Sequence, residues 1–193
     1  NFTLECMVNF NKFGRQISTI MGIEGNFLLR VGDAGVPDNQ LQVACSRNLT
    51  SSDLQFETGK WYHVAVTFDN GTVIVYFNGV EKLTGNCGTS IVSLGAAHSE
   101  TETSSRCFWI GYSYASDRYL DGKICEARIW NRTLTSEEIN SPNHFYSVDP
   151  LSDGLVAYWK FDDGAGNKIK DYSVNGNDLT VDSNPDWTKV SLP

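Results

Sequence analysis

The amino-acid sequence predicts an all-β fold, a two-sheet antiparallel β-sandwich with one short helix. Three observations support this prediction. Apolar and polar residues alternate along many short segments, which is the period of a half-buried strand. Asn-Gly pairs and other turn signals separate these segments at short intervals. The chain of 193 residues also has a common length for a single β-rich domain, and about a dozen short strands fit within it.

The N-terminal part contains three segments with strand character, which are FTLECMVNF, NFLLRVG and QLQVACS. Each is rich in the apolar, β-branched or aromatic residues that favour strands. The stretch DAGVPDNQ separates the second segment from the third, and its glycine, proline and asparagine are typical of a turn. We therefore expect three strands in this part of the chain.

The clearest pattern lies in KWYHVAVTFDNGTVIVYFNGVEKL, residues 60–83. Alternate positions of two successive strands place apolar side chains on one face: Tyr62, Val64, Val66 and Phe68, then Val73, Val75 and Phe77. Asn70-Gly71 predicts the hairpin turn between these strands, because both residues accept positive φ, and Asn78-Gly79 predicts the next turn. We expect His63 to be packed or hydrogen-bonded within the sheet.

The C-terminal part continues the strand pattern and adds the only predicted helix. Strand character returns in RCFWIGYS, YLDGKICEARIWN and GLVAYWKF, followed by a strand-turn-strand element in IKDYSVNGNDLTV and a closing strand in WTKVSL. The helix lies in LTSEEIN, where Thr135 and Glu138 have the spacing of a capping box and Pro142 ends the helix.

Charge and hydropathy exclude several classes of function. The net charge of −8 argues against nucleic acid and anionic membrane surfaces as partners, because both require basic patches. No apolar run approaches the length of a membrane span. The chain opens without a cleavable leader, so we expect that a leader has been removed and that the sequence is a piece of a longer protein.

The five cysteines are Cys6, Cys45, Cys87, Cys107 and Cys125. They include no CxxC pair, and with only three histidines in the chain a zinc site is not expected. Three of them (Cys6, Cys45 and Cys125) lie in apolar segments and are expected to be buried as small hydrophobic residues. Cys87 and Cys107 flank a polar stretch and are the best candidates for a disulfide, which favours a location outside the cytosol.

Three segments resemble those of a known family. GKWYHVAVTFDNGTVIVYFNG is similar to the paired central strands of laminin-G-like, concanavalin A-like jelly rolls, and YLDGKICEARIWNRTLTSEEI to their late strand and short helix. GLVAYWKFDDGAGNKIKDYSVNGNDLTV resembles the segment that usually opens such a domain, although here it lies near the C-terminus, as in a circular permutation.

The resemblance covers nearly the whole chain and implies one jelly-roll β-sandwich domain over residues 1–193. Such domains occur at the C-terminus of secreted or surface proteins of gut Bacteroidetes, often beside glycan-handling domains. The resemblance therefore implies the C-terminal part of a longer bacterial protein located outside the cell or at its surface, with the periplasm as the alternative.

The loop KDYSVNGNDLTV has the composition of a calcium site. Asp171, Asn175 and Asn177 offer oxygen atoms, and the glycine between the two asparagines allows the chain to curl. Laminin-G-like relatives often bind calcium where this turn approaches the late strand, so the resemblance implies Glu126 as a further ligand. Relatives commonly carry aspartate where Cys125 stands, which removes one oxygen here. The alternative is an Asx turn at a strand end, without a metal.

Candidate sugar-binding residues lie in two places, because sugar sites combine aromatic faces with planar polar groups. The first is the connection GYSYASDRYLDG, with Tyr112, Tyr114 and Arg118. The second is Trp130, at a strand end next to Asn131 and Arg132. Three other tryptophans lie in apolar strands and are expected in the core: Trp61, Trp109 and Trp159.

These features predict a non-catalytic glycan-binding module, with calcium as its candidate cofactor and a polysaccharide or glycoprotein as its partner. The main alternative is a spacer or protein-interaction domain that positions a neighbouring domain and binds no glycan. A glycosidase or lyase ranks last, because no pair of carboxylates has the spacing of a catalytic pair on one strand.

Overall fold

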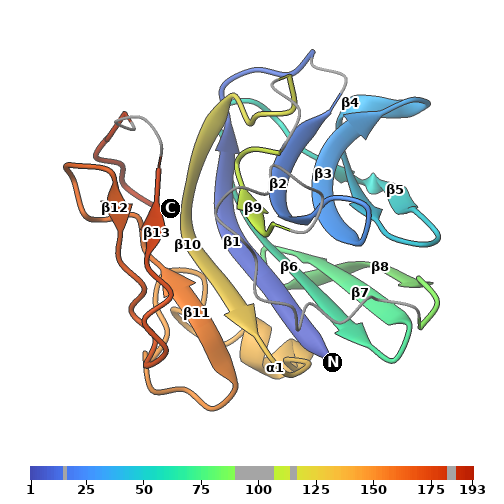
Figure 1. The fold of residues 1–193 in the computed structure, drawn as a ribbon. Coiled ribbons are helices and arrows are strands. Elements are labelled where there is room, and N and C mark those ends of the chain that lie inside the picture. Colours follow the sequence, from blue (N-terminus) through green and yellow to red (C-terminus); the bar gives the residue numbers. More distant parts are fainter. Residues whose placement is uncertain (15–16, 90–106, 114–116, 182–185) are drawn as a thin grey trace.

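The computed structural model describes residues 1–14, 17–89, 107–113, 117–181 and 186–193. In these residues the chain forms two antiparallel sheets that pack face to face, with one short helix at one end (Figure 1). The two-sheet antiparallel β-sandwich predicted from the sequence is therefore confirmed.

The larger sheet has six strands, in the order β11–β10–β1–β6–β7–β8, and every neighbouring pair is antiparallel. Its strands are β11 (Leu155–Trp159), β10 (Gly122–Trp130), β1 (Phe2–Phe10), β6 (Trp61–Asp69), β7 (Thr72–Phe77) and β8 (Val80–Asn86). The N-terminal strand thus lies in the middle of the sheet, between strands from distant parts of the sequence.

The smaller sheet has five strands in the order β5–β4–β3–β2–β9. Its strands are β5 (Leu49–Gln55), β4 (Val36–Ala44), β3 (Phe27–Asp33), β2 (Ser18–Ile23) and β9 (Trp109–Ile110). A separate two-stranded sheet pairs β12 (Lys168–Ile169) with β13 (Leu179–Thr180). Strands β2 and β5 were not expected from the sequence.

The core lies between the two large sheets. The alternate residues that the sequence places on one face of β6 and β7 all pack there, among them Val64, Val66, Val73 and Val75, each fully buried. Alternation with period two explains this arrangement, because it directs every second side chain of a strand into the sandwich.

The predicted turns and helix are present. Asn70 and Gly71 have φ of 44° and 97°, and Asn78 and Gly79 have φ of 49° and 76°, as two-residue hairpin turns require. Helix α1 (Ser136–Ile139) begins after Thr135, whose hydroxyl accepts a hydrogen bond from the Glu138 amide in a complete capping box. The helix packs Ile139 against the outer face of the larger sheet.

One predicted strand is absent. The segment WTKVSL has no regular secondary structure, although it lies beside β10 (Figure 1). Trp187 of this segment packs its ring against the edge of the core, and its indole nitrogen donates to the carbonyl of Gly166 at 3.1 Å. This ring, rather than strand pairing, holds the segment in place.

The disulfide differs from the predicted one. Cys45, directly after β4, is bonded to Cys87, directly after β8, with 6.0 Å between their Cα atoms. The predictions of a Cys87–Cys107 disulfide and of Cys45 as a buried hydrophobic residue are therefore wrong. The physical reason is that edge strands β5 and β8 of opposite sheets meet, which brings the two cysteines together across the sandwich.

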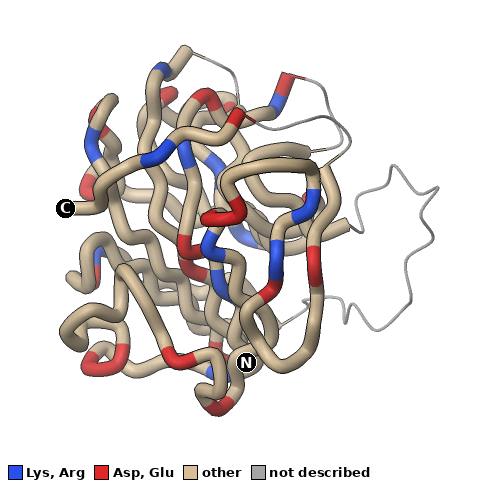
Figure 2. Tube along the Cα trace, turned by 90° about the vertical axis from the view of Figure 1, so that its left-hand side faces the viewer, with Lys and Arg blue, Asp and Glu red and all other residues tan. Residues whose placement is uncertain are grey.

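Acidic and basic residues are interspersed along the trace in Figure 2, and they form no single basic face in that view. Among the described residues, no helix has the length and the apolar character that a membrane crossing requires.

Candidate functional site

A cleft lined by aromatic rings lies between the start of β10 and the C-terminal segment. It consists of two adjoining hollows of about 520 and 540 Å³. Five residues line both hollows: Cys125, Phe161, Trp187, Thr188 and Val190. Trp61, at the start of β6, lines the hollow of about 520 Å³ and is the third aromatic ring of the cleft, after Phe161 and Trp187. We call the joined hollows the aromatic cleft.

Polar side chains stand beside these rings. Asn11, Lys123 and Asp186 line one hollow, and Lys160 and Asp162 line the other. The Lys123 ammonium donates to the Asn11 side-chain oxygen at 3.2 Å. The cleft therefore offers ring faces together with amide, ammonium and carboxylate groups, a combination that fixes polar ligands with apolar faces.

Two tryptophans expected in the core lie outside it. Trp159 is buried as expected, with 3% of its surface exposed, but Trp61 and Trp109 are only partly buried. Trp61 is out of phase with Tyr62 and Val64, whose side chains pack on the core. Sequence reasoning also missed Trp187, because its segment was interpreted as a strand.

The predicted ligand residue Tyr112 lines neither hollow of the aromatic cleft. It follows Gly111, which lines the cleft and accepts a hydrogen bond from the Leu120 amide at 2.8 Å. Tyr112 exposes 38% of its surface, and its ring contacts that of Trp109 edge-on with 5.5 Å between centroids. The Tyr112 ring is therefore exposed, next in the chain to a residue that lines the cleft.

Two further residues of this connection, Arg118 and Tyr114, were predicted to contact the ligand. Arg118 forms an ion pair with Glu24, with 3.0 Å between nitrogen and oxygen, and Glu24 also faces Arg30 at 3.8 Å. Tyr114 lies outside the described residues. Arg118 is thus held by charge pairing beside the smaller sheet.

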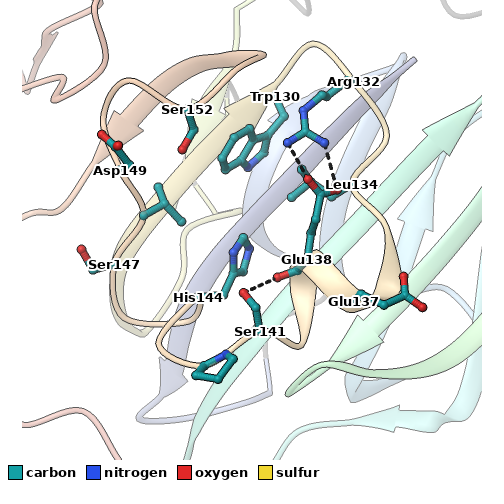
Figure 3. A pocket seen from close by; sticks show the side chains of 12 residues that line it. Trp130, Arg132, Leu134, Glu137, Glu138, Ser141, His144, Ser147, Asp149 and Ser152 are labelled. Atoms are coloured by element: carbon teal, nitrogen blue, oxygen red, sulfur yellow. Dashed lines mark hydrogen bonds and ion pairs between the residues drawn. The ribbon is translucent and has the colours of Figure 1, made fainter.

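Trp130 lines a different pocket, of about 440 Å³, between β10 and the segment that follows α1 (Figure 3). Arg132 and Glu138 form a two-pronged ion pair at its wall, with contacts of 2.9 and 2.8 Å (Figure 3). Trp130 itself is 2% exposed, and its indole nitrogen donates to Glu5 at 2.9 Å. Neighbouring segments thus cover most of the Trp130 ring, and its contact with a ligand stays a prediction.

Trp130 and the Tyr112 connection also belong to separate sites. The connection precedes β10, whereas Trp130 ends it. The nine residues of this strand make eight steps of roughly 3.3 Å, so its two ends lie about 26 Å apart.

A buried charged network underlies Trp130 on the outer face of the larger sheet. Glu5 of β1 is fully buried, and its oxygen Oε2 lies 3.0 Å from Nε2 of His63 and 2.9 Å from Nε2 of His144. Its other oxygen accepts from Trp130 and from Arg128, the latter at 3.3 Å. The expectation that His63 is packed or hydrogen-bonded within the sheet is confirmed, and the structure shows both.

The network keeps Glu5 ionised. Burial raises the pKa of Glu5, but the hydrogen bonds from His144 and His63 and the charge of Arg128 outweigh burial, so the pKa lies well below its ordinary value. The sequence signal for this network is a set of charged residues on strand faces opposite the apolar ones, with Glu5 in FTLECMV and Arg128 in CEARIW.

Glu126, the predicted calcium ligand on β10, belongs to the same network. It has φ of 53° at a β-bulge, a left-handed conformation that costs strain in a residue other than glycine. Its carboxylate oxygen Oε2 accepts from Arg128 at 2.6 Å and from the hydroxyl of Tyr158. Among the described residues, no hydrogen bond or ion pair joins Glu126 to the loop 170–181.

The carboxylate of Asp171 is saturated by the protein. Its two oxygens accept four hydrogen bonds at 2.8 Å, from the amides of Tyr158, Ser173 and Asn177 and from the Ser173 hydroxyl. Burial raises the pKa of Asp171, but these amide hydrogen bonds outweigh burial and lower the pKa. The side-chain amides of Asn175 and Asn177 donate to the carbonyl of Val156, each at 2.9 Å.

These contacts are those of an Asx turn that ties the loop to β11. Both oxygens of Asp171 and the Oε2 atom of Glu126 accept hydrogen bonds from separate sets of protein donors. Calcium binding by this loop stays a prediction, which the following measurement tests.

Replacing Asp171 by alanine is expected to lower the free energy of unfolding by about 3 kcal/mol, because two buried amides and one partly buried amide lose a charged acceptor. Denaturant unfolding in calcium and in chelator checks the cause. We expect the same loss in both, whereas alanine at the exposed Asp163 should change stability by less than about 0.5 kcal/mol. A calcium-dependent gain in the wild type that Asp171→Ala abolishes would identify a metal loop instead.

Comparisons with known proteins agree with this architecture. The family model of the concanavalin A-like lectin/glucanases superfamily matches residues 1–140. No curated protein sequence matches the chain. Among solved structures, a Bacteroides ovatus protein to which carbohydrate binding is ascribed is 30% identical, with a TM-score of 0.74 over 95% of this chain. The chain spans 54% of the length of that protein.

Two more distant structures share the fold. Domain 4 of an extracellular arabinanase from Geobacillus stearothermophilus, solved with arabinotriose, is 23% identical, with a TM-score of 0.52 over 72% of this chain and 64% of its own. The sialidase of Trypanosoma rangeli is 21% identical, with a TM-score of 0.52 over 75% of this chain and 22% of its own. By its sheets and by the match of the family model, the chain belongs to the concanavalin A-like lectin/glucanases superfamily.

Proposed function

We propose that this chain is a non-catalytic glycan-binding module and that the glycan binds in the aromatic cleft. The observation that carries the proposal is that three partly exposed rings, those of Trp61, Phe161 and Trp187, line one cleft together with charged and amide side chains. Rigid rings present a large apolar face at low entropic cost, and planar polar groups fix the orientation of hydroxyls.

The likeness to the Bacteroides ovatus protein supports the ligand class, since carbohydrate binding is ascribed to that protein and the two chains share 30% identity. Two of the three carboxylates that line the cleft are held by protein groups, which supports a non-catalytic role. Glu126 is engaged by Arg128 and Tyr158, and Asp162 accepts from the Tyr172 hydroxyl at 3.0 Å. The third, Asp186, is exposed.

We also propose a secreted or cell-surface bacterial protein, in which this module is joined to a neighbouring domain. The Cys45–Cys87 disulfide supports an oxidising compartment. The Bacteroides ovatus relative, of which this chain spans 54%, supports a longer parent protein. Labelling of the parent protein by a membrane-impermeant reagent on intact cells tests the location.

A glycan array followed by titration of the best oligosaccharide tests the function. We expect Trp187→Ala to weaken binding at least about tenfold, a loss of about 1.4 kcal/mol or more, because the ring is both an apolar contact and a wall of the cleft. Tyr146→Ala is the matched control, since Tyr146 is a 37% exposed ring that does not line the cleft.

The thermal midpoint of each variant shows whether it remains folded at the temperature of the titration. Binding that survives both Trp187→Ala and Trp61→Ala would move the glycan out of the aromatic cleft. Failure of the wild type to bind any glycan of a broad array would favour the spacer domain.

A further inference from the structure

Two histidines and a glutamate converge inside the molecule, on the outer face of the larger sheet. Glu5 lies on β1, His63 on β6 and His144 on the segment that follows α1, so the three come from distant parts of the sequence. Glu5 and His63 are fully buried and His144 is 8% exposed. Among the described residues, this is the only group of three or more metal-ligating side chains with donor atoms this close together.

The donor atoms have the arrangement of a metal site. Both imidazole Nε2 atoms point at the same carboxylate oxygen, Oε2 of Glu5, at 3.0 and 2.9 Å, and all three atoms lie within 4.8 Å of one another. Zinc bonds of about 2.0–2.1 Å in a tetrahedron place neighbouring donors about 3.4 Å apart. Tetrahedral binding would therefore lengthen both nitrogen–oxygen distances by about 0.4–0.5 Å and bring the two nitrogens, which lie within 4.8 Å of each other, closer by up to about 1.4 Å.

The surroundings of Glu5 leave one oxygen for a metal. The other oxygen, Oε1, accepts from the Trp130 indole at 2.9 Å and from Arg128 at 3.3 Å. Carboxylates that bind metals are commonly held in this way through the oxygen that faces away from the ion. The Nδ1 atom of His63 is buried and lacks a hydrogen-bond partner. It is an acceptor when Nε2 carries the proton and a donor when Nε2 binds a metal.

Arg128 does not compete with a metal for the same oxygen of Glu5. It contacts Oε1 of Glu5 at 3.3 Å and Oε2 of Glu126 at 2.6 Å. A cation bound at Oε2 of Glu5 would therefore leave both ion pairs of Arg128 in place.

We propose that Glu5, His63 and His144 bind one zinc ion. Two imidazole nitrogens and one carboxylate oxygen form a donor set that zinc accepts, with water in the fourth position. His144 lines the pocket of Figure 3, which gives the ion and its water a path to solvent. The bound zinc ties the segment after α1 to strands β1 and β6.

Metal analysis of the untagged chain tests this proposal. The protein is stripped with a chelator, titrated with zinc chloride by calorimetry, and measured for metal content and thermal midpoint. We expect one zinc per chain and a higher midpoint that chelator reverses, as for any ligand that binds only the folded state. Absence of zinc uptake by the wild type would overturn the proposal.

Conservative variants locate the ion. His144→Gln and His63→Gln keep an amide donor near Glu5 but remove a good metal ligand, so we expect zinc affinity to fall at least about 100-fold. His98→Gln, which changes the third histidine of the chain, should leave one tightly bound zinc. Zinc retained by both His63→Gln and His144→Gln would overturn the site. The outcome is independent of whether the aromatic cleft binds a glycan.

Discussion

Replacing Arg128 by alanine is expected to lower the free energy of unfolding by about 3–5 kcal/mol, because it leaves buried carboxylates without their cation. Arg128 has no exposed side-chain surface and pairs with both Glu5 and Glu126. It also donates to the carbonyl of His144 at 2.8 Å, so the change releases the segment after α1 from the sheet. Denaturant unfolding of the two proteins measures the loss.

Arg132→Ala is the matched control, since it removes the same side chain from an exposed ion pair. Arg132 and Glu138 expose 33% and 38% of their side chains, and a pair of this kind contributes about 1 kcal/mol or less. Equal losses in Arg128→Ala and Arg132→Ala would show that the buried network does not carry the stability assigned to it.

Removal of the Cys45–Cys87 disulfide is expected to cost about 4 kcal/mol. The bond closes a loop with a sequence separation of 42 residues, and the chain-entropy model gives about 3 kcal/mol for a 15-residue loop and about 4.7 kcal/mol for a 100-residue loop. The bond also joins the edges of the two sheets, so its loss frees β5 from β8. Unfolding of the double variant Cys45→Ser/Cys87→Ser measures the effect.

Unfolding in the presence of a reductant provides the control for the comparison between the wild type and the double variant. The reductant should lower the unfolding midpoint of the wild type to about that of the double variant, and it should leave the double variant unchanged. A reductant-induced drop of the same size in the double variant would place the stabilising disulfide between other cysteines.

Local pattern was sufficient to predict much of the fold. Alternation along β6 and β7 predicts which residues face the core, because a strand has only two faces. Asn70-Gly71 and Asn78-Gly79 predict their hairpins, since positive φ is required at those positions. The capping box of Thr135 and Glu138 predicts the start of α1. Each of these signals acts within a few residues.

The features that the sequence did not predict depend on contacts between distant segments. Glu5 and His144 are 139 residues apart, and no spacing rule joins them. The pairing of Cys45 with Cys87 follows from the approach of two sheet edges. Glu126 was assigned to the calcium loop from its place on the late strand, but the β-bulge directs its carboxylate to Arg128 and Tyr158.

The residues that line the aromatic cleft depend on contacts between distant segments in the same way. Tyr112 is exposed, as a tyrosine in a polar connection suggests. Trp130 is buried because the segment after α1 covers it, which its own strand does not reveal. Trp187 could not be identified, because only the folded chain places the C-terminal segment beside β10.

Indole resonances of the five tryptophans during titration with the best oligosaccharide test the glycan site most directly. We expect the N–H signals of Trp61 and Trp187 to shift with the ligand, because both rings line the aromatic cleft. Those of Trp130 and Trp159 should stay in place, since both rings are buried and neither lines the cleft. Shifts confined to Trp130, or saturable binding that moves neither Trp61 nor Trp187, would contradict the assignment of the cleft.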